Sequence, residues 1–426
     1  MYQIVISLYL IGVAIASLFS KKVKTMWRGE RRAISDIRAK VDPEARYIWV
    51  HAASLGEFEQ GRPIIERIRA EHPEYKILLT FFSPSGYEVR KNYDGADIIT
   101  YLPIDTLRNA RRFLNAIHPV CALFIKYEFW YNYLHILKKR GVPVYSVSSI
   151  FRPDQIFFKG YGRQYSRVLR CFTHFFVQNA GSRRLLADKL GLFNVTITGD
   201  TRFDRVLTIA QQAKEIPVVE QFLKRNSGKR IFIAGSSWQP DEEIFIPYFK
   251  DKHDWALIIA PHVIGEEHLQ QIEALLKANG RTPLRFTEAS GKTSDGERQG
   301  TEDSMSAAAS ADALIINCFG LLSSIYRYAD VTYVGGGFGV SIHNLPEAAV
   351  WSKPVIFGPE NRKFQEAQDL KACGGGIEIS GSEVFAETMD RFIADDDALA
   401  TAAKAAGDYV RSKAGATDTI LKAIHL

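Results

Sequence analysis

Two carboxylate residues follow apolar, β-rich runs of the sequence at the points where those runs end. Glu57 comes after Tyr47–Val50 and a stretch of small residues, and Glu128 follows Val120–Ile125 almost directly. At the carboxyl ends of strands in an open α/β sheet, side chains lie where ligands bind, and a carboxylate there can act as a general base. Glu57 could equally serve the start of the next helix, because carboxylates stabilise the positive end of the helix dipole. Glu128 could be an ordinary surface acid, although its aromatic neighbours favour an enclosed position.

An arginine closes the last strand of the first half of the chain. Arg202 lies in the run from Thr198 to Asp204. Its guanidinium could hold a phosphate or carboxylate through two parallel hydrogen bonds. A structural ion pair with Asp200 or Asp204 is equally compatible with the sequence.

The second half contains turns that could bind a nucleotide. Gly335–Gly337 follow the apolar run Val331–Val334, and His343, Asn344 and Glu347 come soon after. Exposed amides in a glycine turn bind phosphate well, and a nearby carboxylate can accept hydrogen bonds from ribose hydroxyls. We favour this interpretation over a tight turn alone, although the run is not a dinucleotide-binding fingerprint. Pro261 and His262 end another apolar run in the same way.

The composition sets limits on the class of protein. The chain has 426 residues, 46% of them hydrophobic and 24% charged, which suits two globular domains. A net charge of +6 is too small to indicate nucleic-acid binding by itself. The four cysteines are far apart and no histidine pair has metal-ligand spacing, so the sequence predicts neither a disulfide framework nor a metal site.

The amino terminus is apolar and is followed by a basic segment. Residues Ile4–Phe19 carry no charge, and Lys21–Lys40 contain eight basic residues against two acidic ones. This order predicts an uncleaved membrane anchor, spanning or lying in the interface, with the remaining chain in the cytoplasm. A cleaved signal sequence is the less favoured alternative, because no basic region precedes the apolar run.

From Tyr47 onward, short β-rich runs alternate with helical stretches, and the alternation restarts after a polar connector near residue 228. Such alternation predicts an α/β protein with two doubly wound, Rossmann-like units. The expected boundaries are a membrane anchor over 1–20, a first domain over 21–205, a linker over 206–228 and a second domain over 229–426. This prediction includes the option that the last helix packs on the first domain.

Several of these residues, taken in order along the chain, resemble one enzyme family. The set consists of Ser54-Leu55-Gly56-Glu57, Glu128-Phe129-Trp130, Thr198-Gly199 with Phe203-Asp204, and His343-Asn344 with Glu347-Ala348-Ala349. It resembles the Kdo transferases of Gram-negative bacteria, which move 3-deoxy-D-manno-oct-2-ulosonic acid (Kdo) from its CMP ester to lipid A precursors. The resemblance implies the GT-B glycosyltransferase fold, with two Rossmann-like domains facing a central cleft, and no metal or other cofactor.

The resemblance also implies roles for individual residues. Glu57 would be the general base for transfer of Kdo from CMP-Kdo to lipid IVA at the cytoplasmic face of the inner membrane. Because a helix amino terminus lowers the pKa of a carboxyl group, Glu57 is expected to owe its basicity to desolvation by substrate. Glu128 and Arg202 would stabilise the transition state. The CMP site would consist of Pro261, His262, Phe319, Gly320, Leu321, Asn344, Leu345, Pro346 and Glu347.

Some positions depart from the commoner family pattern. His262 stands where many members have Arg, Leu321 where many have Glu, and Arg202 where many have Lys. These changes affect individual CMP contacts. Two alternatives therefore stay open: another GT-B enzyme that uses a UDP-sugar (a transferase or an epimerase), and a non-catalytic, membrane-tethered nucleotide-binding protein.

Overall fold

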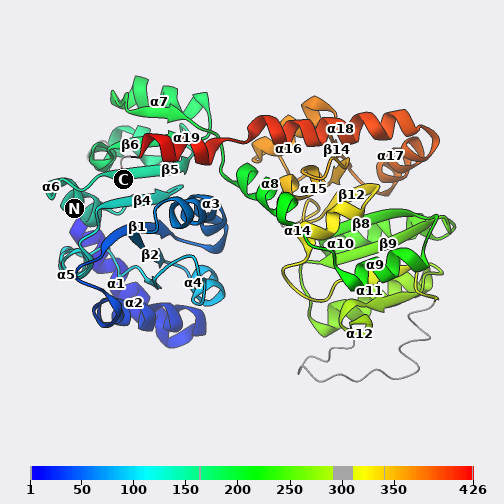
Figure 1. The fold of residues 1–426 in the computed structure, drawn as a ribbon, viewed down its shortest axis with the longest axis horizontal. Coiled ribbons are helices and arrows are strands. Elements are labelled where there is room, and N and C mark those ends of the chain that lie inside the picture. The colour runs from blue at the N-terminus through cyan, green and yellow to red at the C-terminus, as the bar shows by residue number, and fades with distance from the viewer. Residues whose placement is uncertain (1, 163–164, 291–309, 340, 425) are drawn as a thin grey trace. The chain divides into compact units, whose positions relative to one another are not determined.

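The chain folds into two compact units, each built around a parallel seven-stranded sheet with helices on both faces (Figure 1). The computed structural model describes residues 2–162, 165–290, 310–339, 341–424 and 426. The first unit comprises residues 1–205 and 413–426, and the second comprises residues 206–412. The predicted α/β class with two Rossmann-like units is confirmed.

The sheet of the first unit has the strand order β3-β2-β1-β4-β5-β6-β7. Its strands read as continuous apolar runs because both faces are covered; six of the seven residues of β1 are buried. The strand bounds are β1 (Arg46–Ala52), β2 (Tyr75–Phe81), β3 (Ile98–Tyr101), β4 (Cys121–Ile125), β5 (Val144–Ser149), β6 (His174–Val177) and β7 (Val195–Ile197).

The two faces of this sheet carry different helices. Alternate residues of β1 supply the two cores: Trp49 packs with Phe113 of α5 and Tyr133 of α6, whereas Val50 packs in the cluster that contains Phe58 of α3 and Ile420 of α19. The period-two alternation of side chains along a strand accounts for this division. The helices are α3 (Leu55–Glu71), α4 (Pro84–Arg90), α5 (Leu107–Ile117), α6 (Tyr131–Lys139), α7 (Ala180–Leu190) and α19 (Ala416–Ala423), with 3-10 turns at Ile156–Phe158, Gly160–Gly162 and Tyr165–Cys171.

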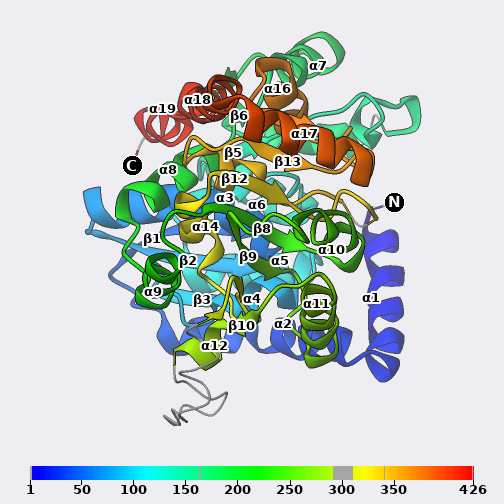
Figure 2. The same cartoon turned by 90° about the vertical axis from the view of Figure 1, so that its right-hand side faces the viewer.

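Two amino-terminal helices meet at a corner on the first unit (Figure 2). They are α1 (Tyr2–Phe19) and α2 (Lys21–Lys40), and the Ser20 hydroxyl between them caps α2 by accepting a hydrogen bond from the amide of Val23. Helix α2 packs its buried residues Ile34 and Ile37 into the core beneath the sheet. Helix α1 is long and apolar enough to cross a membrane, and most of its surface is exposed.

The second unit repeats the architecture with the strand order β10-β11-β9-β8-β12-β13-β14. Its strands are β8 (Arg230–Ser237), β9 (Trp255–Pro261), β10 (Pro283–Arg285), β11 (Ala313–Ile315), β12 (Val331–Val334), β13 (Val355–Phe357) and β14 (Gly376–Glu378). Its helices are α9 (Pro217–Arg225), α10 (Gln239–Phe245), α11 (Glu266–Ala278), α12 (Phe286–Ala289), α14 (Leu322–Ile325), α15 (Leu345–Ala349), α16 (Gln365–Cys373), α17 (Ser382–Ala394) and α18 (Asp396–Lys413), with 3-10 turns at Pro247–Phe249 and Tyr326–Tyr328.

The chain passes between the units twice. The first passage runs through α8 (Arg202–Gln212), and α8 and α9 together occupy most of the 206–228 segment for which the sequence predicts a linker. The residues of this segment pack as part of the second unit. After α18 the chain returns, and residues 413–426, including α19, belong to the first unit.

One carboxylate ties the two passages together inside the first unit. Asp204, in the first turn of α8, accepts hydrogen bonds from the Gly415 amide (2.6 Å), the Thr417 amide (2.7 Å) and the Thr417 hydroxyl (2.7 Å). The amides belong to the amino terminus of α19, whose own cap residue is a glycine without a side chain. Asp204 therefore caps a helix that is distant in sequence.

We expect Asp204→Ala to lower the free energy of unfolding of the first unit by about 2–4 kcal/mol, because it leaves amides at the start of α19 without a partner. Urea unfolding and limited proteolysis of the carboxyl-terminal segment measure the effect. Asp418→Ala is the matched control: Asp418 lies in the same helix and pairs with the exposed Arg67 (2.6 Å), so its removal should cost only about 0–1 kcal/mol. Equal effects of the two substitutions would contradict the capping role.

Candidate active site

Glu57 lies at the carboxyl edge of the first sheet, in the first turn of α3. The strand β1 ends at Ala52, and Ser54 is the cap residue of the helix that follows. The Glu57 carboxylate turns back and accepts a hydrogen bond from the Ala53 amide at 2.5 Å. The capping role that the sequence left open is therefore real, and it fixes the position of the carboxylate at the sheet edge.

The pKa of Glu57 is nevertheless raised, to about 7. Burial is the main cause, and the negative charge of Glu128 adds to it. The amides of Ala53 and Ser54 and the charge of Lys126 act in the opposite direction but are outweighed. The sequence led us to expect that desolvation by substrate would make Glu57 basic, but the protein itself already buries the carboxyl group enough to raise its pKa.

Glu128 follows β4, the neighbour of β1 in the sheet, and its side chain is 11% exposed. Its Oε2 atom lies 3.0 Å from Nε2 of His51 and accepts a hydrogen bond from Nε1 of Trp130 at 2.6 Å. His51 is in β1 and is completely buried. The carboxylate of Glu128 is thus held by two ring nitrogens, one from inside the sheet and one from the turn before α6.

The hydrogen bonds around His51 favour one tautomer. With the proton on Nε2, His51 donates to Glu128, and its Nδ1 atom accepts from the Thr80 hydroxyl at 2.9 Å. The same hydroxyl oxygen accepts from Nε1 of Trp49 at 2.8 Å. Every polar atom in this chain of contacts then has a partner of the correct kind. His51 therefore holds Glu128 in position through a hydrogen bond from the buried strand β1.

His51 was not among the residues predicted from the sequence. Histidines were considered there as metal ligands, for which no spacing was present, or, for His262 and His343, as part of a nucleotide site. The available signal was different: His51 is a polar residue inside an otherwise apolar run that forms a buried strand. Buried polar side chains require partners, and the partner here is one of the two carboxylates predicted to act in catalysis.

Arg202 forms the structural pair that the sequence allowed. Its Nε and one terminal nitrogen each lie 2.9 Å from Asp200 Oδ2. Asp200 is 5% exposed and also accepts hydrogen bonds from the amide groups of Gln60 (3.0 Å) and Gln178 (3.2 Å). Burial alone would raise the pKa of Asp200, but Arg202 and these hydrogen bonds hold it below its ordinary value.

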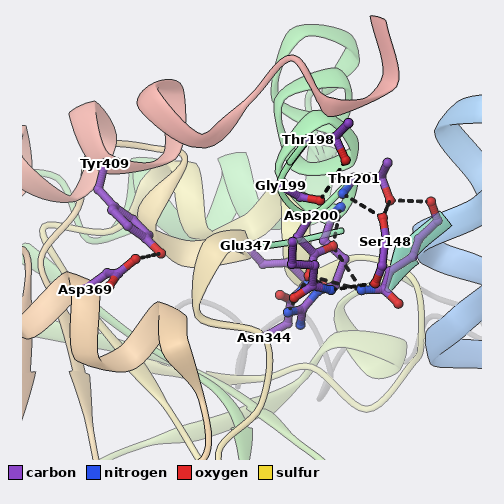
Figure 3. Close-up of polar contacts among 12 residues, drawn as sticks. Ser148, Thr198, Gly199, Asp200, Thr201, Asn344, Glu347, Asp369 and Tyr409 are labelled. Carbon is purple, nitrogen blue, oxygen red and sulfur yellow. Dashed lines mark hydrogen bonds and ion pairs between the residues drawn. The ribbon is translucent and has the colours of Figure 1, made fainter. Parts of the chain in front are cut away.

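Figure 3 shows this cluster at the ends of β5 and β7, where the Ser148 hydroxyl also meets that of Thr201 at 2.9 Å. Gln60, which donates to Asp200, is on α3 one turn after Glu57. One helix therefore carries Glu57 and a member of the Asp200 cluster. The charges of both Glu57 and Asp200 act on Tyr127, which precedes Glu128. The structure therefore brings the three predicted catalytic residues, Glu57, Glu128 and Arg202, to one edge of the first sheet.

In the second unit, Glu347 is held by two side chains. Its Oε1 accepts from Asn344 Nδ2 at 2.7 Å (Figure 3). Its Oε2 accepts from the Ser323 hydroxyl, also at 2.7 Å. Glu347 lies in the first turn of α15 and Ser323 lies in α14. The Oδ1 atom of Asn344 is buried and has no hydrogen-bond partner among the described residues. A preorganised carboxylate next to an unsatisfied amide oxygen suits the recognition of hydroxyl groups.

His262 stacks between two other rings. Its ring centroid lies 4.7 Å from that of Trp238 and 4.4 Å from that of His343. Trp238 Nε1 donates to Nε2 of His343 at 3.2 Å. Burial and the neighbouring His262 lower the pKa of His343 to about 4, so His343 is uncharged near neutral pH. This cluster presents flat rings rather than a cationic side chain.

The remaining predicted CMP residues lie in turns after the strands. Pro261 ends β9 and is buried. Phe319 is 77% exposed, and Gly320 has a φ of 91°, which only glycine adopts without strain. Leu321 precedes α14. Leu345 and Pro346 are buried at the start of α15, so their side chains support this turn.

The glycine turn after β12 is required by the packing of the protein itself. A Cβ atom on Gly335 would lie 2.5 Å from the Ser236 carbonyl oxygen, and one on Gly337 would lie 2.6 Å from Gly358 Cα. The Gly336 amide already donates to Asp241 at 2.9 Å. Close backbone packing thus explains these glycines without a ligand.

The part of the chain that the structure describes holds no group of three or more His, Cys, Asp or Glu side chains arranged to bind a metal ion. The expected absence of a metal cofactor remains a prediction.

Comparisons with known proteins point to one family. A family model described as 3-deoxy-D-manno-octulosonic-acid transferase matches residues 27–205. A 3-deoxy-D-manno-octulosonic acid transferase of Aquifex aeolicus is 27% identical over 78% of this chain and 82% of its own length. One from Bordetella pertussis is 26% identical over 90% of this chain and 87% of its own. A bifunctional glycosyltransferase/methyltransferase of Fusobacterium nucleatum is 24% identical over 87% of this chain, which spans only 56% of that protein.

Solved structures with a similar fold are more distant in sequence. UDP-GlcNAc 2-epimerase from Neisseria meningitidis, solved with UDP-GlcNAc, has a TM-score of 0.61 at 13% identity and covers 88% of this chain and 98% of its own. A glycosyltransferase from Rickettsia africae has a TM-score of 0.56 at 10% identity, covering 89% and 97%. At such identities the similarity shows the fold alone, and these neighbours are GT-B-like.

We expect Glu128→Gln to lower the pKa of Glu57 toward its ordinary value, because the substitution removes the charge that helps to raise it. A carbon-13 NMR titration of glutamate carboxyl groups measures the shift. Glu59→Gln is the control: it removes a charge from the same helix, at a residue paired with Arg90 (2.8 Å), and should leave the Glu57 titration in place. An unchanged pKa in the Glu128 variant would show that burial alone sets it.

Proposed function

We propose that the chain is a 3-deoxy-D-manno-octulosonic acid transferase that moves Kdo from CMP-Kdo to lipid IVA during lipopolysaccharide synthesis, as the family model over residues 27–205 and the relatives with 26–27% identity support. In the proposed reaction a hydroxyl oxygen of the acceptor attacks the anomeric carbon of Kdo, CMP leaves, and the configuration inverts. The observation that carries the proposal is the pair of carboxylates at the sheet edge, of which Glu57 has a pKa of about 7.

We assign the role of general base to Glu57. A base with a pKa near the working pH combines a sufficient ionised fraction with a real affinity for the proton. Glu57 accepts the hydroxyl proton as the new bond forms. Glu128, whose carboxylate is fixed by His51 and Trp130, keeps a negative charge next to the base, and this charge favours proton uptake by Glu57.

Arg202 supplies a positive charge at this edge. Its pair with Asp200 orients the guanidinium, and a guanidinium held in this way can stabilise charge that develops on the donor in the transition state. The assignment to transition-state stabilisation is proposed for Glu128 and Arg202 alike.

The second unit would bind the CMP portion. The carboxylate of Glu347, held on both oxygens, would accept hydrogen bonds from ribose hydroxyls, and the unsatisfied Asn344 oxygen could accept another. The phosphate would be bound by backbone amides of the turns at Pro261-His262, Phe319–Leu321 and Asn344–Glu347. The neutral ring cluster at His262 takes the place of a cation that many relatives have, which leaves more of the phosphate charge to those amides.

We also propose that α1 lies in the membrane interface and does not span the bilayer. The Tyr2 hydroxyl donates to the buried Asp105 (2.5 Å), and Gln3 donates to Asn132 (2.5 Å). The other end of α1 continues at Ser20 into α2, which packs on the same unit. A spanning helix cannot keep both ends on one domain, whereas an interfacial helix can expose side chains such as Leu18, which is 79% exposed. The remaining chain would lie on the cytoplasmic face of the inner membrane.

We expect Glu57→Gln to reduce Kdo transfer by at least about 100-fold while leaving the melting temperature and CMP binding unchanged, because the amide cannot take the proton. Mass spectrometry of lipid IVA incubated with CMP-Kdo and enzyme measures the product. Activity of the unmodified enzyme should also fall as the pH drops below about 7, where Glu57 becomes protonated.

Two controls sharpen this experiment. Glu59→Gln, two residues further along α3, should transfer Kdo normally. Replacing CMP-Kdo by a UDP-sugar should give no product; a glycosylated product from the UDP-sugar would favour the alternative GT-B enzyme. A complete lack of product with CMP-Kdo would favour a non-catalytic nucleotide-binding protein, and substantial turnover by the Glu57→Gln variant would exclude Glu57 as the base.

Deletion of residues 1–20 should weaken sedimentation with membranes more than it weakens transfer to detergent-dispersed acceptor, because the exposed apolar surface of α1 is lost while the sheet edge is kept. A milder control is Tyr2→Phe, which removes one hydrogen bond to Asp105 but no apolar surface, and which should sediment normally. Unchanged sedimentation of the truncated chain would contradict the interfacial role of α1.

A further inference from the structure

A cavity of about 340 Å³ opens among α1, α2 and α5, away from Glu57 and Glu128. Its lining combines apolar side chains, including Leu10 of α1 and Trp27 of α2, with an acidic and two basic residues, Glu30, Arg31 and Arg112. A volume of this size suits a small ligand or the polar end of a larger one.

Glu30 is the unusual member of this lining. It is only 4% exposed, and in the part of the chain that the structure describes neither of its carboxylate oxygens has a hydrogen-bond partner. Buried polar groups are normally paired, and leaving one unpaired costs stability. Glu30 sits in the wall of a cavity, so a ligand in that cavity can supply the missing partners.

The chemistry of Glu30 selects a cationic partner. Burial raises the pKa of Glu30 to about 8, so the carboxyl group carries a proton in the empty cavity at neutral pH. A bound ammonium group would favour the ionised form and would offer N–H donors to both oxygens. The charged and titratable groups around Glu30 are Arg31 on the same helix, Arg112 on α5, Tyr9 on α1, Tyr101 on β3 and Tyr133 on α6.

The two arginines select an anion for the other part of the ligand. Arg31 and Arg112 are both exposed, and neither forms an ion pair with a carboxylate of the described residues. The Arg31 guanidinium carbon lies 6.0 Å from the centroid of the Trp27 ring, which helps to hold it at the cavity. Guanidinium groups bind phosphate oxygens through paired hydrogen bonds.

We propose that this cavity binds the ethanolamine phosphate headgroup of a membrane phospholipid. Glu30 receives the ammonium group, Arg31 and Arg112 receive the phosphate, and the acyl chains lie along the apolar surface of α1 beside Leu10. The site is independent of the proposed Kdo transfer and serves to fasten the first unit to its membrane in one orientation.

The same residues exclude related headgroups. A choline headgroup carries a phosphate and a positive charge, but its quaternary nitrogen has no N–H group to donate to Glu30. An anionic headgroup without an amine satisfies the arginines and leaves the buried carboxyl group unpaired. An amine with N–H donors, joined to a phosphate, offers partners to Glu30 and to both arginines.

Co-sedimentation with vesicles tests the proposal. The full chain should bind phosphatidylcholine vesicles that contain phosphatidylethanolamine roughly tenfold more tightly than pure phosphatidylcholine vesicles, as a charge-assisted hydrogen bond would give. Glu30→Gln should abolish this preference, and Asp36→Asn, which removes an exposed acid from the same helix, should retain it. Arg112→Gln should weaken binding to the mixed vesicles more than Arg111→Gln, its exposed neighbour on α5.

Glu30→Met provides a second variant in case the amide disturbs folding. It should raise the melting temperature, because it removes two unpaired buried oxygens, and should still lose the preference for phosphatidylethanolamine. An undiminished preference in either Glu30 variant would overturn the proposal, as would stronger binding of the unmodified chain to phosphatidylglycerol than to phosphatidylethanolamine. Saturation of the site by soluble glycerophosphoethanolamine at the vesicle affinity would overturn the assignment to a lipid. Kdo transfer, measured separately, reports on the other site.

Discussion

The fixed negative charge of Glu128 beside Glu57 is the constraint on which the candidate active site depends. The negative charge of one carboxylate raises the pKa of a second carboxyl group nearby, because like charges repel each other. Burial is the main cause of the raised pKa of Glu57, and the charge of Glu128, which the ring nitrogens of His51 and Trp130 hold in place, adds to it. Hydrogen bonds that run from Trp49 through Thr80 and His51 hold Glu128 in place. They thus contribute to the proton affinity of Glu57.

The same site shows how opposing effects on one carboxyl group are resolved. The start of α3 and the Lys126 charge favour the ionised form of Glu57, whereas burial and Glu128 favour the protonated form. Burial and Glu128 together have the larger effect, which leaves the pKa of Glu57 near 7 and not as high as that of a fully buried acid. The hydrogen bond from the Ala53 amide is the reason that the carboxylate remains oriented at this pKa. Capping and basicity are therefore compatible in Glu57.

Much of this architecture could be predicted from sequence periodicity. The apolar runs Tyr47–Val50, Val120–Ile125 and Val331–Val334 correspond to the central strands β1, β4 and β12. The edge strand β14 has no such run in the sequence, because Gly376–Glu378 is short and begins with glycine, which weakens any strand signal. Local patterns could place Glu57 and Glu128 at strand ends, since parallel strands align their carboxyl edges.

Pairings between distant segments could not be predicted. Nothing in the local sequence joins Asp204 to Gly415 and Thr417, or His51 to Glu128, because such contacts depend on how the elements pack. The burial of Glu30 could not be predicted either. In the sequence Glu30 is one acid in a basic segment, and it is enclosed only by the packing of α1 and α5 against α2.

The first unit contains the features on which the proposed function depends. It carries the apolar helix α1, the basic helix α2 and the carboxylate pair at Glu57 and Glu128 within one compact unit. The tie between Tyr2 and Asp105 is informative here, because Asp105 also accepts from the Asn132 and Tyr133 amides at the start of α6. Helix α6 begins directly after Trp130, a hydrogen-bond partner of Glu128. The contact that fastens α1 to the protein therefore lies within one helical turn of Trp130 in the sequence, so the start of α6 connects the attachment of α1 to a residue that holds Glu128.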